Sequence, residues 1–186
     1  MCEDKENTVE QASSLLNDKA SSLLQDNLSS GLSESFRTYR RNLPHWEMPG
    51  SIYFITFRTV QGFVLEDHAR DIVLQAICFH KDKKYALSAA VIMPDHAHLI
   101  LQPLKKSETC FYSLAEITHS IKSYSAKQVN RALSRSGSVW LDESFDRIIR
   151  DDNELAEKLN YVLNNPFKAG LCDKERGYKW MIMGDK

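Results

Sequence analysis

Two apolar segments separated by a proline and an aspartate restrict the fold of this chain more than any other feature. Residues 85–93 read YALSAAVIM and residues 96–102 read HAHLILQ, with Pro94-Asp95 between them. Each segment has the length and composition of a buried strand, and the proline-aspartate pair favours a tight turn. The two segments are therefore predicted to form an antiparallel hairpin.

The residues on either side of this hairpin predict further strands and helices. SIYFITFRTV (51–60) is dense in β-branched and aromatic residues and predicts a first strand. Apolar positions recur at helical spacing from Glu66 until the basic HKDKK stretch, and Ser113-Leu-Ala-Glu116 matches a capping box that opens a helix to about Leu133.

Beyond these helices, the C-terminal part predicts a short strand or irregular edge over 139–150 and one more helix. Asp151 or Asp152 caps that helix, and Asn165-Pro166 is expected to end it. The whole pattern predicts an α+β fold, an antiparallel sheet with helices packed on it, as in a ferredoxin- or RRM-like sandwich.

Length and charge indicate one folded unit with an unequal distribution of charge. The 186 residues suit a single domain over 36–186, preceded by a Ser-, Asn- and Asp-rich extension over 1–35 that is predicted to be disordered or loosely attached. The formal net charge is −1, yet residues 36–141 alone carry +6. A basic centre is compatible with a phosphate backbone as partner.

Several classes of protein are disfavoured by what the sequence lacks. No apolar run is long enough for a membrane span, and the acidic start MCEDKENTVE lacks the pattern of a secretory signal, so a cytoplasmic protein is expected. The four cysteines are scattered without a CxxC pair, which argues against a zinc knuckle or a disulfide framework. No glycine-rich phosphate loop is visible, so no nucleotide cofactor is expected.

His96 and His98 stand one residue apart in the third predicted strand. Side chains at i and i+2 of a strand point to the same face, so the two imidazoles are able to converge on one divalent cation. The alternative is a pair of hydrogen-bonded, partly buried histidines without a metal, because such tripeptides also occur by chance.

Tyr124 and Gln128 are candidates to complete such a site. They lie at i and i+4 of the helix that starts at Ser113, and the spacing places them on the predicted inward face with Ile117 and Ile121. A polar pair on an inward face costs stability unless it has partners. The alternative is a tyrosine whose hydroxyl is hydrogen-bonded at the edge of the core.

The ordered set of motifs resembles a known family. MPDHAHLILQP and IKSYSAKQ are similar to the histidine-hydrophobic-histidine motif and the tyrosine helix of single-tyrosine transposases of the IS200 type. Over about residues 36–172 the chain resembles one branch, the REP-associated tyrosine transposases; the segments that carry this resemblance are YRRNLPHWEMPGSIYFITFR, VWLDESFDRIIRDDNEL and LNYVLNNPFKAGL.

This resemblance implies an enzyme that nicks and rejoins single-stranded or hairpin DNA through a 5′-phosphotyrosine. It implies Tyr124 as the nucleophile, and His96, His98 and Gln128 as ligands of Mg²⁺ or Mn²⁺. Tyr112 is a rival nucleophile in a predicted loop, and Asn130, about 200° around the helix from Gln128, is a weaker third ligand.

DNA contacts are expected from cations and stacking rings. The candidates are Tyr39, Arg40, Arg41, Lys122, Lys127 and Arg131. The protein is expected to act as a monomer or homodimer. Two other functions stay open: a DNA-binding or regulatory protein of the same fold with little catalysis, and an RNA-binding sheet domain, which the missing RNP-type stretch disfavours.

Overall fold

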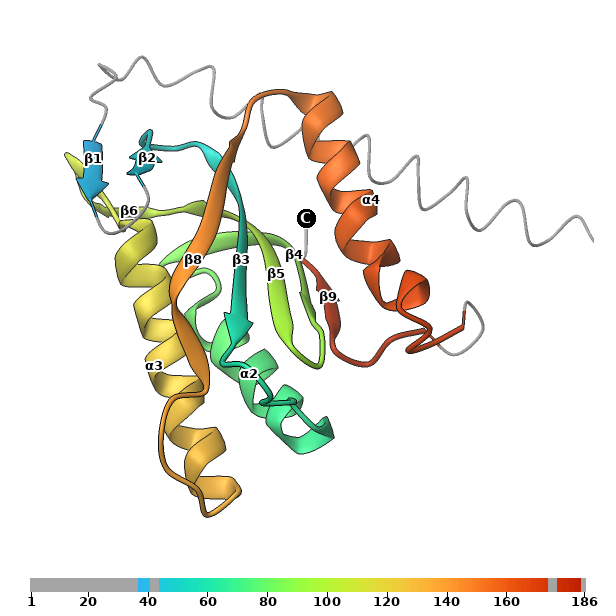
Figure 1. Cartoon of the computed structure of the whole chain (residues 1–186). Helices are drawn as coiled ribbons and strands as arrows, with labels where there is room; N and C mark the ends of the chain where they lie inside the picture. The colour runs from blue at the N-terminus through green and yellow to red at the C-terminus, as the bar shows by residue number, and fades with distance from the viewer. Residues whose placement is uncertain (1–36, 41–43, 174–176, 185–186) are drawn as a thin grey trace, which may run out of the picture.

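The structure is a computed structural model that describes residues 37–40, 44–173 and 177–184. An antiparallel sheet in the strand order β8-β3-β5-β4-β9 forms its centre, and helices cover both of its faces (Figure 1). The elements follow the chain as β1 (Arg37–Arg40), β2 (Pro44–Glu47), β3 (Ile52–Thr59), α2 (Asp67–His80), β4 (Tyr85–Ile92), β5 (His96–Pro103), β6 (Lys105–Ser107), β7 (Cys110–Phe111), α3 (Leu114–Ala132), β8 (Trp140–Ile149), α4 (Asp152–Lys168) and β9 (Met181–Met183). The predicted α+β class is confirmed.

The register of the strands divides the sheet into two faces. On β5, Ala97 pairs with Phe57 of β3 on one face, and His98 pairs with Thr56 on the other face. Paired residues of an antiparallel sheet point to the same side, and neighbours along a strand point to opposite sides. The sheet therefore has an Ala97 face and a His98 face, and these names are kept below.

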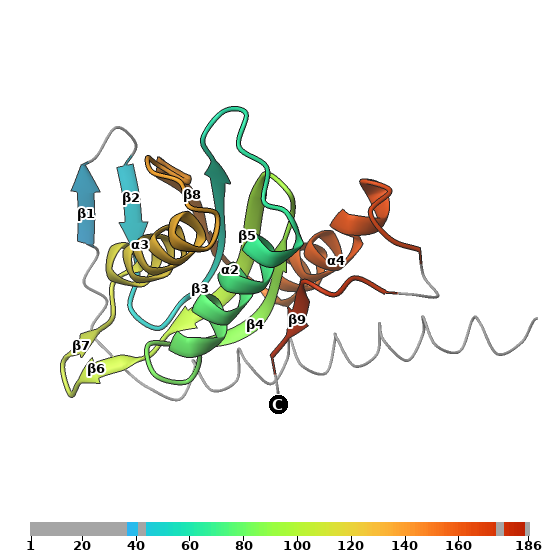
Figure 2. The same cartoon turned by 90° about the horizontal axis from the view of Figure 1, so that it is seen from below.

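Helices α2 and α3 cover the Ala97 face. The indole nitrogen of Trp140 donates a hydrogen bond of 3.0 Å to the hydroxyl of Ser125 on α3, and the Trp140 ring contacts Phe57 edge to face. In Figure 1, α2 and α3 lie side by side at the lower left, away from α4. Figure 2 shows the same elements from below.

Helix α4 covers part of the His98 face. Its Tyr161 ring contacts both His98 and Phe54, with ring centroids 5.2 and 5.9 Å apart. The helix packs against β4 and β5. Buried Leu155, Leu159 and Val162 form the apolar stripe that the sequence spacing predicts.

One predicted element is longer than expected, and one predicted helix end is wrong. The segment after residue 139, predicted as a short strand or irregular edge, forms the ten-residue edge strand β8, which pairs with β3 from Ile52–Ile149 to Thr59–Trp140 with one irregularity. Helix α4 does not end at Asn165-Pro166 but continues to Lys168, with Pro166 buried in its last turn. A proline so close to the helix end interrupts little of the backbone ladder, and the amide of Leu171 still donates to its carbonyl.

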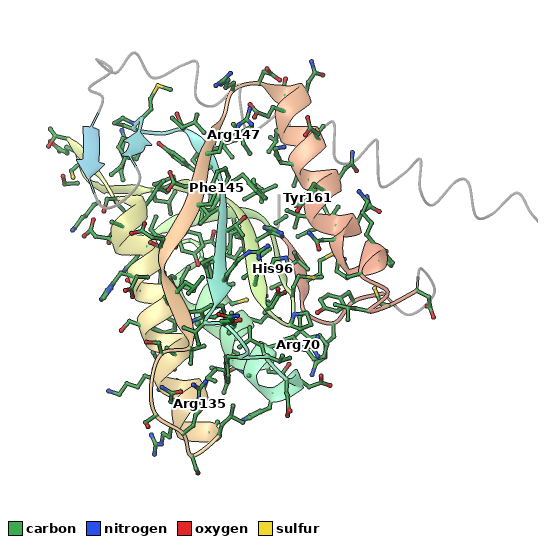
Figure 3. The ribbon with its side chains drawn as sticks, in the orientation of Figure 1. Arg70, His96, Arg135, Phe145, Arg147 and Tyr161 are labelled. Atoms are coloured by element: carbon green, nitrogen blue, oxygen red, sulfur yellow. The ribbon has the colours of Figure 1, made fainter. Side chains whose placement is uncertain are left out.

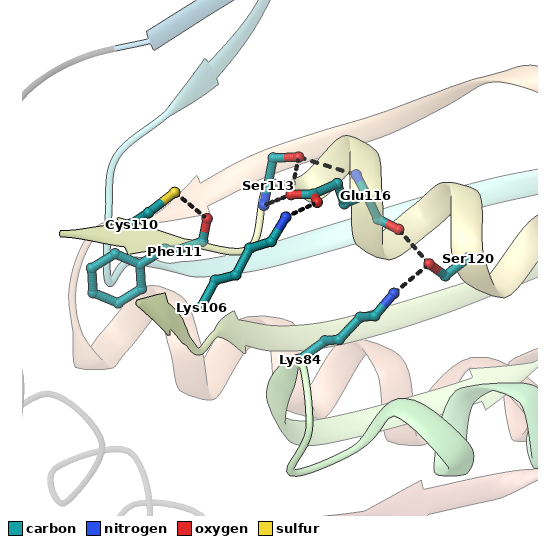
Figure 4. A network of polar contacts seen from close by, with 7 residues as sticks. All are labelled: Lys84, Lys106, Cys110, Phe111, Ser113, Glu116 and Ser120. Atoms are coloured by element: carbon teal, nitrogen blue, oxygen red, sulfur yellow. Dashed lines mark hydrogen bonds and ion pairs between the residues drawn. The ribbon is translucent and has the colours of Figure 1, made fainter. Parts of the chain in front are cut away.

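The predicted capping box at the start of α3 is confirmed. The Ser113 hydroxyl accepts from the Glu116 amide at 3.1 Å, and the Glu116 carboxylate accepts from the Ser113 amide (Figure 4). Two lysines fix this helix to its surroundings, because Lys106 pairs with Glu116 and Lys84 donates to Ser120 at 2.7 Å. Lys106, together with the Ser113 amide, holds the pKa of the Glu116 carboxyl below its ordinary value.

Ser125 connects α3 to the sheet through a buried hydrogen bond, which gives a stability prediction. We expect Ser125→Ala to lower the free energy of unfolding by about 1–3 kcal/mol, because the buried indole N–H of Trp140 would lose its acceptor. Ser123→Ala, two residues away on the exposed side of the same helix, is the matched control and should change stability little. Urea denaturation of both variants checks this, and equal midpoints would contradict it.

Among the described residues, no helix has both the length and the apolar character that crossing a membrane requires. The cysteines at 78, 110 and 172 are free thiols. The predicted extension over 1–35 lies outside the described residues.

Candidate metal and nucleophile site

His96 and His98 lie together on the His98 face, as their spacing predicts. Their ring centroids are 4.6 Å apart, and the rings meet edge to face. His98 is 5% exposed and stacks on Phe54 at 5.3 Å, while the His96 side chain is 14% exposed. The pair therefore sits at the boundary between the core and the surface.

The hydrogen bonds of both histidines leave the same ring nitrogen available. His96 Nδ1 lies 2.6 Å from a carboxylate oxygen of Asp95, so Nδ1 is the ring nitrogen that donates to this oxygen. His98 Nδ1 lies 2.7 Å from the hydroxyl of Thr56. Carboxylate and hydroxyl partners of this kind orient metal-binding histidines and leave Nε2 as the ligand atom.

The Nε2 atom of His98 is buried and has no hydrogen-bond partner among the described residues. Burial, with smaller contributions from His96 and Arg58, lowers the pKa of His98 to about 3, so its imidazole is neutral at pH 7. A buried polar nitrogen without a partner costs free energy unless a ligand engages it. A neutral imidazole with a lone pair on Nε2 has the form that a divalent cation binds.

Tyr161 is the tyrosine that the structure brings to the histidines. Its ring contacts that of His98 at a centroid distance of 5.2 Å, and its side chain is 43% exposed. Helix α4 positions it because the buried stripe at Leu159 and Val162 faces the sheet and places Tyr161 at the edge of that contact. Figure 3 shows Tyr161 on α4 close to His96 on β5.

Asn165 is the candidate for a third donor. It follows Tyr161 by four residues, so the two side chains lie on one side of α4, and it is partly buried. The described residues contain no group of three or more His, Cys, Asp or Glu side chains that would hold a metal. The amide oxygen of Asn165 is our candidate for a third protein ligand at this site, and water and phosphate oxygens would complete the shell.

The predicted placement of Tyr124 and Gln128 opposite the histidines is wrong. The inward positions of α3 are Ile117, Ile121, Ser125 and Val129, so the buried face continues at Ser125 rather than at Tyr124. Tyr124 and Gln128 are turned about 100° from these positions, towards α2. Helix α3 covers the Ala97 face, so the sheet separates both side chains from His96 and His98.

Tyr124 and Gln128 instead belong to a hollow between α2 and α3. The Tyr124 ring is 51% exposed and lies 6.5 Å from the Phe79 ring, nearly parallel to it. The hollow has a volume of about 430 Å³ and is lined by His68, Ile72, Gln75, Tyr124, Gln128, Arg131 and Ala132.

Asn130, the alternative third ligand, and Tyr112, the alternative nucleophile, also lie away from the histidines. Asn130 donates from its amide nitrogen to the Gly137 carbonyl at 2.7 Å, on the same helix as Gln128. Tyr112 lies in the loop between β7 and α3, as predicted, beside the ammonium groups of Lys84 and Lys106. Neither is in position to serve the histidine pair.

The predicted DNA-binding residues of α3 are on the side of the sheet that the histidines do not use. Lys122 donates to the Asp142 carbonyl at 2.7 Å, while Lys127 and Arg131 are exposed. DNA contacts by these three stay a prediction, but such contacts would be remote from the histidines. Tyr39 and Arg40 belong to β1, whose side chains the structure does not describe, and Arg41 lies outside the described residues.

The fold and this site define a class of α+β proteins. Its central strand, here β5, carries two histidines at i and i+2, and a helix on the same side of the sheet, here α4, places a tyrosine beside them. The chain is 26% identical over 150 residues to a protein of Haemophilus influenzae provisionally named REP-associated tyrosine transposase, with 73% of this chain and 78% of that protein covered. No family model matches.

A solved structure of a REP-associated tyrosine transposase bound to a REP hairpin shares the fold. Its TM-score is 0.55 at 21% identity, and the match covers 72% of this chain and 74% of the other. The resemblance to REP-associated tyrosine transposases that the sequence motifs indicate is thus confirmed in sequence and in fold.

A signal for Tyr161 was present in the sequence. The segment LNYVLNNPFKAGL contains a tyrosine and an asparagine at i and i+4, and Tyr124 and Gln128 have the same spacing of a tyrosine and an amide. This spacing does not reveal which face of the sheet each helix covers. The covered face decides whether Tyr124 and Gln128 or Tyr161 and Asn165 lie beside the histidines.

Proposed function

We propose that this chain is a single-tyrosine enzyme that nicks and rejoins single-stranded DNA of the hairpin type, with Tyr161 as its nucleophile and His96 and His98 as metal ligands. The observation that carries the proposal is the contact of the Tyr161 ring with His98, whose buried Nε2 has no partner among the described residues. The name of the H. influenzae relative and the hairpin bound by the fold relative support a transposase-like activity on such DNA.

The proposed reaction begins when the Tyr161 oxygen attacks the scissile phosphorus. A bond forms between this oxygen and phosphorus, the bond to the 3′ oxygen breaks, and the phenolic proton leaves while the 3′ oxygen gains a proton. The 5′ end stays on the protein as a phosphotyrosine, and attack by a 3′-hydroxyl of another strand reverses the step. The covalent bond stores the energy of the cleaved linkage, so no nucleotide cofactor is required.

The histidines would hold a divalent cation, Mg²⁺ or Mn²⁺, through Nε2, and Asn165 would add an amide oxygen. Such an ion polarises the phosphate and stabilises the charge that develops on its oxygens. Asp95 and Thr56 orient the imidazoles of His96 and His98 through hydrogen bonds at Nδ1, and α4 holds Tyr161 beside them.

The alternative is a DNA-binding or regulatory protein with little catalysis. Protein with end-labelled single-stranded hairpin DNA is incubated with Mn²⁺, with Mg²⁺ or with a chelator, and the products are separated under denaturing conditions. We expect a covalent protein–DNA band with either metal and its loss with the chelator. Binding without any covalent band under all conditions would favour the regulatory function instead.

A further inference from the structure

We propose that the exposed ring of Phe145 is a stacking platform for a nucleobase within about three nucleotides of the scissile phosphate, with Arg58 and Arg147 holding the neighbouring phosphates. This inference rests on the proposed function and adds to it the residues that hold the single strand in place. It concerns the part of the His98 face that α4 leaves uncovered.

Phe145 lies on the same face of the sheet as His98, two strands away from it. The register pairs Phe145 of β8 with Thr56 of β3, and Thr56 with His98 of β5, so the three side chains point to the same face. Neighbouring strands are about 4.8 Å apart, which places the backbone of Phe145 about 10 Å from that of His98. Between them, Thr56 is small and is engaged with His98 Nδ1.

The Phe145 ring is 55% exposed, although it lies beside the site. Helix α4 packs on β4 and β5, and among the described residues nothing buries the Phe145 ring on β8. Figure 3 shows Phe145 and Arg147 on β8, with Tyr161 across the face on α4. Single exposed apolar side chains are normal on a protein surface, so exposure alone would indicate nothing.

Two arginines distinguish this ring from an ordinary exposed phenylalanine. Arg58 of β3 pairs with His96 of β5 in the sheet register, so its side chain lies on the His98 face. This side chain is exposed and forms no ion pair with another described residue. Arg147 lies two residues from Phe145 on the same face; it pairs with Glu154 at 2.7 Å while its side chain stays 48% exposed. An aromatic ring flanked by cations binds single strands through base stacking and phosphate attraction.

The distance limits which base is involved. A strand whose bases stay stacked advances about 3.4 Å per nucleotide, as in a duplex. A separation of about 10 Å between the backbones of His98 and Phe145 therefore corresponds to about three stacked nucleotides. The occupant is thus a base close to the nick and not a distant part of a hairpin stem.

The test uses hairpin oligonucleotides that carry the fluorescent base 2-aminopurine at one of the three positions on either side of the nick. The protein carries Tyr161→Phe, so the DNA stays intact. Stacking on a ring quenches this fluorophore. We expect quenching at one position, its loss with Phe145→Ala, its retention with Phe145→Tyr, and a DNA affinity about 5- to 150-fold lower for the alanine variant.

Phe79→Ala is the matched control. Phe79 is 61% exposed, beside Tyr124 on the other side of the sheet, so its removal should leave both quenching and affinity unchanged. Thermal unfolding of each variant checks the fold. Unchanged quenching with Phe145→Ala, equal effects of both alanine variants, or no binding of any of these oligonucleotides would overturn the inference.

An abasic site at the quenched position separates this inference from the proposed chemistry. It should weaken binding by the wild-type chain, and Phe145→Ala should then cause no further loss. A further loss of the same size on abasic DNA would show that the ring does not act on that base. Absence of a covalent adduct from the wild-type chain, with quenching intact, would refute the proposed reaction and leave the stacking role standing.

Discussion

Tyr161→Phe should abolish the covalent protein–DNA adduct, lowering its rate of formation by at least about 10³-fold, whereas Tyr124→Phe should form it at nearly the wild-type rate. Removal of one oxygen eliminates the proposed nucleophile but keeps the ring that contacts Phe54 and His98. Tyr124 lies beside Phe79 between α2 and α3, on the other side of the sheet. Quantification of the adduct on denaturing gels measures both rates.

The two phenylalanine variants control for each other, because each removes a single hydroxyl from a half-exposed tyrosine. Both should bind hairpin DNA and unfold at temperatures close to that of the wild-type chain. A full-strength adduct from Tyr161→Phe, or its loss only in Tyr124→Phe, would contradict the site described above.

His96→Ala should lower cleavage by about 10³-fold, which corresponds to about 4 kcal/mol of transition-state stabilisation. It removes one of the two imidazoles at the site and leaves His98 Nε2 with only the proposed Asn165 oxygen as a protein partner for the ion, which weakens the metal site. Mn²⁺ binding to the DNA-free protein, measured by calorimetry, should be lost as well, while hairpin affinity should stay within a few-fold.

His119→Ala is the comparison for this variant, since His119 is exposed on α3. It should change neither Mn²⁺ binding nor cleavage. Cleavage by His96→Ala at the wild-type rate would remove the metal assignment, even if the tyrosine assignment survived.

The hairpin of β4 and β5 and the placement of the two histidines on one face could be predicted because they depend on local patterns. Alternation along a strand places His96 and His98 on one face whatever the rest of the chain does. The turn at Pro94-Asp95 sets the hairpin, and the reciprocal bonds of Ser113 and Glu116 involve residues three apart. Each of these features needs only neighbouring residues.

The position of the tyrosine could not be predicted in the same way, because it depends on distant contacts. Ser125 takes an inward place on α3 since its hydroxyl donates to the Ile121 carbonyl and accepts from the Trp140 indole. Hydrophobicity alone favours Tyr124 at that place, and a one-residue difference rotates the helix face by about 100°. The sequence also does not state that α4, rather than α3, covers the His98 face.

The most direct test of the account is to identify the tyrosine that carries the DNA. The adduct formed by the wild-type chain is digested with nuclease and trypsin, and the phosphorylated peptide is sequenced by mass spectrometry. We expect the modification on residues 159–168, LNYVLNNPFK, at Tyr161. A modification on residues 123–127, SYSAK, at Tyr124 would contradict it.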